Sequence, residues 1–160
     1  MPSPPKLSKR RQVRERVLQA LYAAELSEDE AADVLKKIVR PPFEEDNTYV
    51  RFAERLFLRT LDTRTAADVL MDSHVENWEL SRLALTDRIV IRMAVAEMLH
   101  FADIPPKVTL NEYVEVARAF GTDKSGAFVN GVLDAILREL RETGRMQKSG
   151  RGLVETGTKK

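Results

Sequence analysis

Two histidines, His74 and His100, are the only imidazole side chains in this 160-residue chain, which contains no cysteine. Nucleophilic catalysis needs a hydroxyl or thiol with a base in hydrogen-bond reach, and neither histidine has a neighbouring sequence signature of that kind. Both are expected at helix ends, where the helix dipole favours a cation. The seven glycines stand singly or in the C-terminal tail, so they form no phosphate-binding loop. The sequence therefore predicts no enzyme active site, no metal site and no cofactor.

A cluster of arginines near the N-terminus is better suited to binding. Arg10, Arg11 and Arg14 would form one edge of a helix, beside an apolar stripe that begins at Val13 and Val17. Guanidinium groups bind phosphates bidentately and stack on unpaired bases, so such an edge suits single-stranded RNA. Short basic clusters are common, and the alternative is a solubilising start of a helix.

The charge distribution supports a polyanionic partner, although the net charge is only +1. Residues 1–16 hold six Lys or Arg against one Glu, and residues 138–160 hold seven against three, so the intervening body is acidic. Basic ends suit nucleic acid or an anionic surface, and an acidic body suits a basic protein. No apolar run approaches the roughly 18 residues of a membrane span, and no signal peptide is recognisable, so we expect a cytoplasmic protein.

Apolar residues recur at three- and four-residue spacing along most of the chain, which predicts an all-α fold. Trp78, Leu80 and Leu83 predict a short packed connection. The helix that begins near Thr86 is apolar on most sides and is expected to be central. The expected helices cover residues 8–26, 27–40, 47 to about 69, 86–98, 109–120 and 125–142.

Local signals predict where these helices begin and end. Capping boxes are expected at Ser27 with Glu30 and at Thr109 with Glu112, and Thr86 is expected to cap its helix. Gly121 is expected to end a helix in the left-handed conformation. Beyond Thr143 the chain has too little apolar surface to offset the entropy of ordering. The predicted organisation is a flexible basic N-terminus (1–8), a helical RNA-binding domain (9–142) and a flexible basic tail (143–160).

Several segments resemble the NusB family of transcription antitermination factors, over about residues 9–140. The resemblance is weak between residues 28 and 78, and Phe128-Val129-Asn130-Gly131-Val132-Leu133-Asp134 is its most specific element. The other segments that carry it are 10–22, 86–94, 97–98, 104–105, 107–112, 114–118 and 120–121. It implies a bundle of about seven helices, built as two packed three-helix bundles.

The resemblance also implies a function. Family members are non-enzymatic factors that pair with the ribosomal protein NusE and bind the boxA element of nascent, single-stranded RNA. The complex joins RNA polymerase and promotes antitermination, chiefly on ribosomal RNA operons. The charge distribution agrees with this function, because the basic ends would meet RNA and the acidic body a basic ribosomal protein.

Residue by residue, the resemblance implies two sets of contacts. Gln12 departs from the family's arginine-rich segment, where another basic residue is frequent. The implied RNA-binding residues are Arg10, Arg11, Arg14, Arg92, Lys124 and Phe128, and the implied NusE-binding residues are Tyr22 and Asp87. Phe128 could instead belong to the core with Val132 and Ile136, and Arg92 could instead be an intrahelical partner on the helix face of Arg88 and Glu97.

Two other functions compete with this interpretation. The same helical module could be the RNA-docking part of a ribosomal RNA methyltransferase, which would need a Gly-rich cofactor loop that these residues lack. A helix-turn-helix DNA regulator would need a recognition helix rich in polar side chains, and the expected helix over 109–120 is too apolar for that role.

Overall fold

The computed structural model describes residues 8–76, 79 and 82–154. Its described residues form helices and no strand, so the all-α prediction is confirmed. The α-helices are α1 (Lys9–Leu26), α2 (Ala31–Val34), α3 (Asn47–His74), α5 (Leu85–His100), α6 (Pro106–Phe120) and α7 (Ser125–Glu142). Shorter helical segments are η1 (Leu35–Val39), η2 (Pro41–Phe43) and η3 (Gly150–Leu153). Trp78 and Leu80 of the predicted connection lie outside the described residues.

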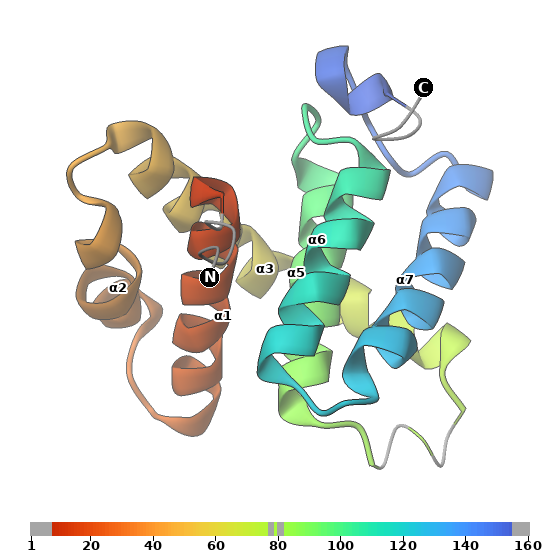
Figure 1. The fold of residues 1–160 in the computed structure, drawn as a ribbon, viewed down its shortest axis with the longest axis horizontal. Coiled ribbons are helices and arrows are strands. Elements are labelled where there is room, and N and C mark those ends of the chain that lie inside the picture. The colour runs from red at the N-terminus through yellow and green to blue at the C-terminus, as the bar shows by residue number, and fades with distance from the viewer. Residues whose placement is uncertain (1–7, 77–78, 80–81, 155–160) are drawn as a thin grey trace, which may run out of the picture. The chain divides into compact units, whose positions relative to one another are not determined.

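The chain divides into two compact units, residues 1–57 and residues 58–160. The first unit contains α1, the α2–η1 segment, η2 and the start of α3; the second contains the rest of α3 and α5 to α7 (Figure 1). Each unit thus holds at least three helical segments, in agreement with the predicted pair of helical bundles.

In the first unit, helix α1 buries the apolar face that its sequence predicts. Val13 and Val17 are fully buried, and α1 contacts both α2 and η1. The hydroxyl of Ser8 accepts a hydrogen bond from the backbone N–H of Arg11 at 3.0 Å, which caps the helix. Arg16 Nε donates to the carbonyl of Ile38 at 2.8 Å and ties α1 to η1.

The capping box predicted at Ser27 and Glu30 is wrong. Helix α2 begins at Ala31 after Glu30, whose side chain caps nothing, and the Ser27 hydroxyl accepts from the N–H of Asp29 at 3.2 Å. The Ser27 hydroxyl stabilises the turn before the helix, which is the other structure that such a residue favours. Segment η1 then ends at Val39, and Pro41 begins the separate short segment η2.

In the second unit, α5 is the central helix, as its composition predicts. It contacts both α6 and α7, and the three lie side by side (Figure 1). Val90, Ile91, Met93, Ala94 and Val95 are all fully buried. Even so, none of the described helices is both long enough and apolar enough to cross a membrane.

Two predicted helix caps, at Thr109 and at Thr86, are wrong. Glu97 of α5 is fully buried and accepts hydrogen bonds from the hydroxyls of Thr109, at 3.1 Å, and Tyr113. Thr109 lies inside α6, because this helix begins at Pro106, after Pro105. Thr86 lies within the first turn of α5, and the residue that precedes this helix is Ala84.

Gly121 ends α6, but with a φ of −99° it is not left-handed, so that prediction is wrong. A Cβ atom at this position would collide with the side chain of Ser125. Glycine is needed here because the turn between α6 and α7 brings the Ser125 hydroxyl against the backbone of Gly121. The Ser125 hydroxyl accepts a hydrogen bond from the Thr122 N–H at 2.9 Å.

Part of the segment predicted as a flexible tail packs against the second unit. Lys148 Nζ donates to the backbone carbonyls of Glu97, at 3.2 Å, and Phe101, at 2.8 Å. The Ser149 N–H donates to the Ala102 carbonyl at 3.0 Å, and Gly152 is buried against the same carbonyl with no room for a Cβ. Residues 143–154 thus cover the end of α5, and flexibility stays a prediction for residues 155–160.

We expect Lys148→Met to loosen this segment. Lys148 donates to two carbonyls at the end of α5, which also accept backbone hydrogen bonds from the N–H groups of Phe101 and Ile104. Loss of the two hydrogen bonds should cost about 1 kcal/mol of stability and speed hydrogen exchange at the Ser149 amide. Thermal melting and amide exchange measure both effects. Arg145→Met removes an exposed cation from the same segment and should change neither; equal effects from the two variants would contradict this role.

Candidate nucleic-acid interface

The arginine edge of α1 lies in the first unit, held against an aromatic ring from α3. The guanidinium carbon of Arg10 is 4.7 Å from the centre of the Phe52 ring, and that of Arg14 is 5.5 Å from it. Both distances lie within the range of cation–π attraction. Arg10 is exposed and Arg11 is half-buried.

Arg14 is placed differently, because only 2% of it is exposed. It precedes Leu18 and Leu21 by four and seven residues, so it lies on the buried face of the helix. Its guanidinium packs on the Phe52 ring, which Arg10 also contacts. Arg14 thus takes part in packing, whereas Arg10 is exposed and Arg11 half-buried.

Arg92 also has a packing role, in the second unit. Its Nε and Nη2 atoms donate to the two carboxylate oxygens of Asp68 on α3, at 2.8 Å and 3.0 Å. Arg92 is 7% exposed. This bidentate pair joins α3 to α5, and an RNA contact by Arg92 stays a prediction.

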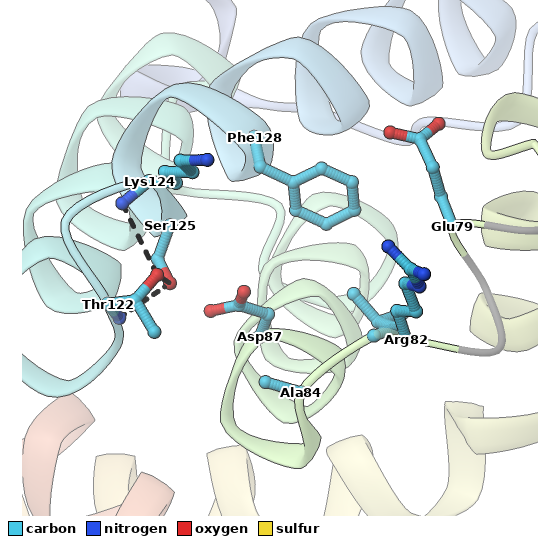
Figure 2. A pocket seen from close by; sticks show the side chains of 9 residues that line it. Glu79, Arg82, Ala84, Asp87, Thr122, Lys124, Ser125 and Phe128 are labelled. Atoms are coloured by element: carbon cyan, nitrogen blue, oxygen red, sulfur yellow. Dashed lines mark hydrogen bonds between the residues drawn. The ribbon is translucent and has the colours of Figure 1, made fainter.

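Lys124 and Phe128 line a cavity of about 390 Å³ in the second unit (Figure 2). Lys124 immediately precedes α7 and is exposed. Phe128 is half-buried, whereas Val132 and Ile136, which follow it along α7, are buried. The ring of Phe128 therefore forms a wall of the cavity, and the interpretation of Phe128 as a plain core residue does not describe it.

Asp87 lines the same cavity from the first turn of α5. Only 7% of Asp87 is exposed, and its Oδ1 atom has no hydrogen-bond partner among the described residues. Burial raises the pKa of this carboxyl, and a hydrogen bond with Ser125 offsets part of the increase. An implied partner-binding residue and two implied RNA-binding residues thus meet in one place.

Because the pKa of Asp87 is raised, replacing its carboxyl with a neutral group should stabilise the fold, by an amount that depends on pH. An acid with a higher pKa in the folded state stabilises the fold below its unfolded pKa, and that stability is lost as the pH rises through the folded pKa. Asp87→Asn should therefore raise the melting temperature at about pH 7, and the gain should shrink as the pH falls toward about 4. Melting curves across this range test it, with Asp123→Asn, an exposed neighbour, as the control. A gain independent of pH would contradict the assignment.

Tyr22, the other implied partner-binding residue, lies on α1 in the first unit and is 40% exposed. Leu26, one turn further along, is 67% exposed and extends this apolar surface. Sequence reasoning missed Leu26, although an apolar residue four positions after Tyr22 at a helix end is a usable signal. Phe52 was missed too, because nothing local pairs it with Arg10. Among the described residues, no three His, Asp or Glu side chains are grouped to hold a metal ion.

Comparison with known proteins shows to which family the chain belongs. The model of the NusB family matches residues 11–138. The chain belongs to the NusB family. The transcription antitermination protein NusB of Salinibacter ruber is 45% identical over 152 residues, which are 95% of each chain. The protein of the same name from Geotalea uraniireducens is 38% identical over 81% of this chain and 94% of its own length.

Solved structures of NusB proteins share the fold. NusB from T. maritima is 34% identical, with a TM-score of 0.74 over 84% of this chain and 94% of that one. A crystal structure of the antitermination factors NusB and NusE in complex with dsRNA contains a chain that is 22% identical, with a TM-score of 0.73 over 84% of this chain and 99% of that one. At 22% identity, this second comparison shows a shared fold and nothing about function.

Proposed function

We propose that this chain is a non-enzymatic transcription antitermination factor that acts in the cytoplasm. It would bind boxA-type single-stranded RNA together with the ribosomal protein NusE and join the RNA polymerase antitermination complex, chiefly on ribosomal RNA operons. The observation that carries this proposal is the exposed Arg10 and half-buried Arg11 at the start of α1, with Arg10 stacked on Phe52, in a chain of the NusB family.

The geometry supports an RNA ligand in the first unit. Arg10 keeps a planar guanidinium in place against Phe52, which lowers the entropy lost when it binds phosphate. Tyr22 and Leu26 supply an exposed apolar patch on the same helix, and such patches are typical of protein interfaces. One helix could thus serve both the RNA and the ribosomal protein.

A binding assay tests the proposal directly. The full chain is titrated into fluorescently labelled single-stranded RNA that carries a boxA-type sequence, and into duplex DNA of the same length, with and without the ribosomal protein. We expect tighter binding to the RNA than to the DNA, and tighter still when the ribosomal protein is present. Equal affinity for the two nucleic acids, or no binding to either, would refute the proposal.

The partner surface is tested separately. Tyr22→Asp places a charge in the apolar patch of α1 and should weaken binding of the ribosomal protein, because burying an unpaired carboxylate is costly. Val69→Asp makes the same change at another exposed apolar position, in the second unit, and serves as the control. Equal weakening by the two variants would show that Tyr22 has no special role.

A further inference from the structure

Residues 143–154, which we call the C-terminal strap, lie beyond the part of the chain that the family model matches, residues 11–138. The strap follows α7, covers the end of α5 and includes η3, which is dark blue in Figure 1. Membership of the NusB family therefore assigns no role to this segment.

Specific contacts hold the strap in one place on the second unit. The Lys148 ammonium and the Ser149 N–H donate to backbone carbonyls at the end of α5, and Gly152 is buried where no Cβ atom would fit. Gly144 and Gly150 have positive φ angles of 68° and 53°, which glycine adopts without strain. The strap thus has a defined conformation and presents a defined surface.

The strap carries positive charge that these contacts do not use. Its cations are Arg145, Lys148 and Arg151, and it contains no acidic residue. Lys148 binds helix carbonyls, as cations near the C-terminus of a helix commonly do. Arg145 and Arg151 are exposed, and neither side chain forms a hydrogen bond or an ion pair with the described residues. Two guanidinium groups are therefore available to a ligand.

The surroundings of the strap also favour an anion. A cavity of about 250 Å³ lies between the strap, the end of α7 and the start of α6, and its charged lining residues are Arg141 and Lys148. The acidic residues next to this surface in sequence are Glu142, just before the strap, and Asp103, just after the covered end of α5. Cations outnumber acids here, so the strap surface attracts negative charge.

We propose that Arg145 and Arg151 of the strap bind the phosphate backbone of single-stranded RNA, as a second contact besides the arginine edge of α1. The proposal rests on the RNA-binding function proposed above, which supplies the polyanion and so favours RNA over an acidic protein. Guanidinium groups bind phosphates bidentately, and a fixed segment loses less entropy on binding than a flexible one. The strap has no aromatic side chain, so this contact would position the RNA without reading its bases.

A double variant tests the two arginines. The full chain is titrated, at several salt concentrations, into a labelled single-stranded RNA that carries a boxA-type sequence with uridines on both sides. Replacing Arg145 and Arg151 with alanine should lower the slope of log affinity against log salt concentration by about 1.4, or about 0.7 for each phosphate contact. Replacing Arg59 and Arg118, exposed arginines on α3 and α6 of the same unit, should leave the slope close to that of the wild type.

A glycine variant tests whether the strap must be held in place. Gly152→Ala changes no charge, but its Cβ atom would collide with the Ala102 carbonyl and displace the strap. We expect RNA affinity to fall roughly threefold, because the arginines must then be ordered on binding. Gly131→Ala adds a Cβ atom where α7 leaves open space and should bind like the wild type. Circular dichroism and thermal melting show whether both variants are folded at the temperature of the titration.

Each other outcome has a defined meaning. A wild-type salt slope in the variant without Arg145 and Arg151 would overturn the strap contact while leaving the RNA-binding function intact. The same slope together with weaker binding of RNA polymerase would show that the strap docks on an acidic protein surface instead. Wild-type affinity in Gly152→Ala would overturn the role of the fixed conformation. Failure of the wild type to bind RNA, alone or with the ribosomal protein, would refute the function itself and the strap contact with it.

Discussion

Replacing Arg10 and Arg11 together with alanine is expected to flatten the dependence of RNA affinity on salt. On a single strand each phosphate contact contributes about 0.7 to the slope of log affinity against log salt concentration, so the loss of two contacts should lower the slope by about 1.4. RNA titrations at several salt concentrations measure the slope. The helix should persist, because alanine favours helix formation at least as well as arginine.

The chain offers a matched control for this double variant. Lys36 and Lys37 are two adjacent exposed cations on η1, in the same unit as α1. Their replacement by alanine removes the same charge and should leave the slope close to that of the wild type. Equal slopes for the two double variants would show that the arginine edge contributes only general positive charge.

Arg14→Ala separates packing from binding within the arginine cluster. Arg14 is buried and stacks on Phe52, so its loss removes contacts inside the first unit. We expect a lower melting temperature and a salt slope that changes less than in Arg10→Ala. A slope that falls by about 0.7, without loss of stability, would show that Arg14 contacts an RNA phosphate.

Helix positions were predictable from the sequence because burial imposes a period on it. The apolar residues of α1 and α5 repeat at three- and four-residue spacing, and the structure buries those residues. The ends were less predictable, because a capping signature is local and other contacts compete for the same side chain. Thr109 shows this, since its hydroxyl bonds Glu97, twelve residues earlier, while Pro105 and Pro106 set the start of α6.

The site was predictable in part, for a related reason. The arginine cluster could be found because its residues are adjacent in sequence, but its support on Phe52 depends on the meeting of α1 and α3. Asp87, Lys124 and Phe128 could be named one by one from the family resemblance. Their shared cavity could not be predicted, because it forms only where the start of α5 meets the start of α7. The burial of Gly152 likewise depends on Ala102, fifty residues away.

Among the described ion pairs, loss of the Arg92–Asp68 pair is expected to lower the free energy of unfolding most. Asp68→Ala would leave the largely buried Arg92 guanidinium without this carboxylate, and because the Asp68 side chain is itself 31% exposed, we expect a loss of about 1–3 kcal/mol. Asp134→Ala breaks an exposed pair with Arg138 on α7 and should cost only about 0.3–0.5 kcal/mol. Chemical denaturation of both variants measures the contrast, and similar small losses would show that the buried pair is not essential to the fold.

Arg92→Met then distinguishes packing from RNA contact at this position. If Arg92 holds α3 against α5, the variant should be less stable, while its folded fraction binds RNA with the affinity and salt slope of the wild type. If Arg92 instead leaves Asp68 to reach a phosphate, the slope should fall by about 0.7. The bidentate geometry and the 7% exposure of Arg92 favour the first result, because freeing the guanidinium would break two hydrogen bonds to Asp68 before any new contact formed.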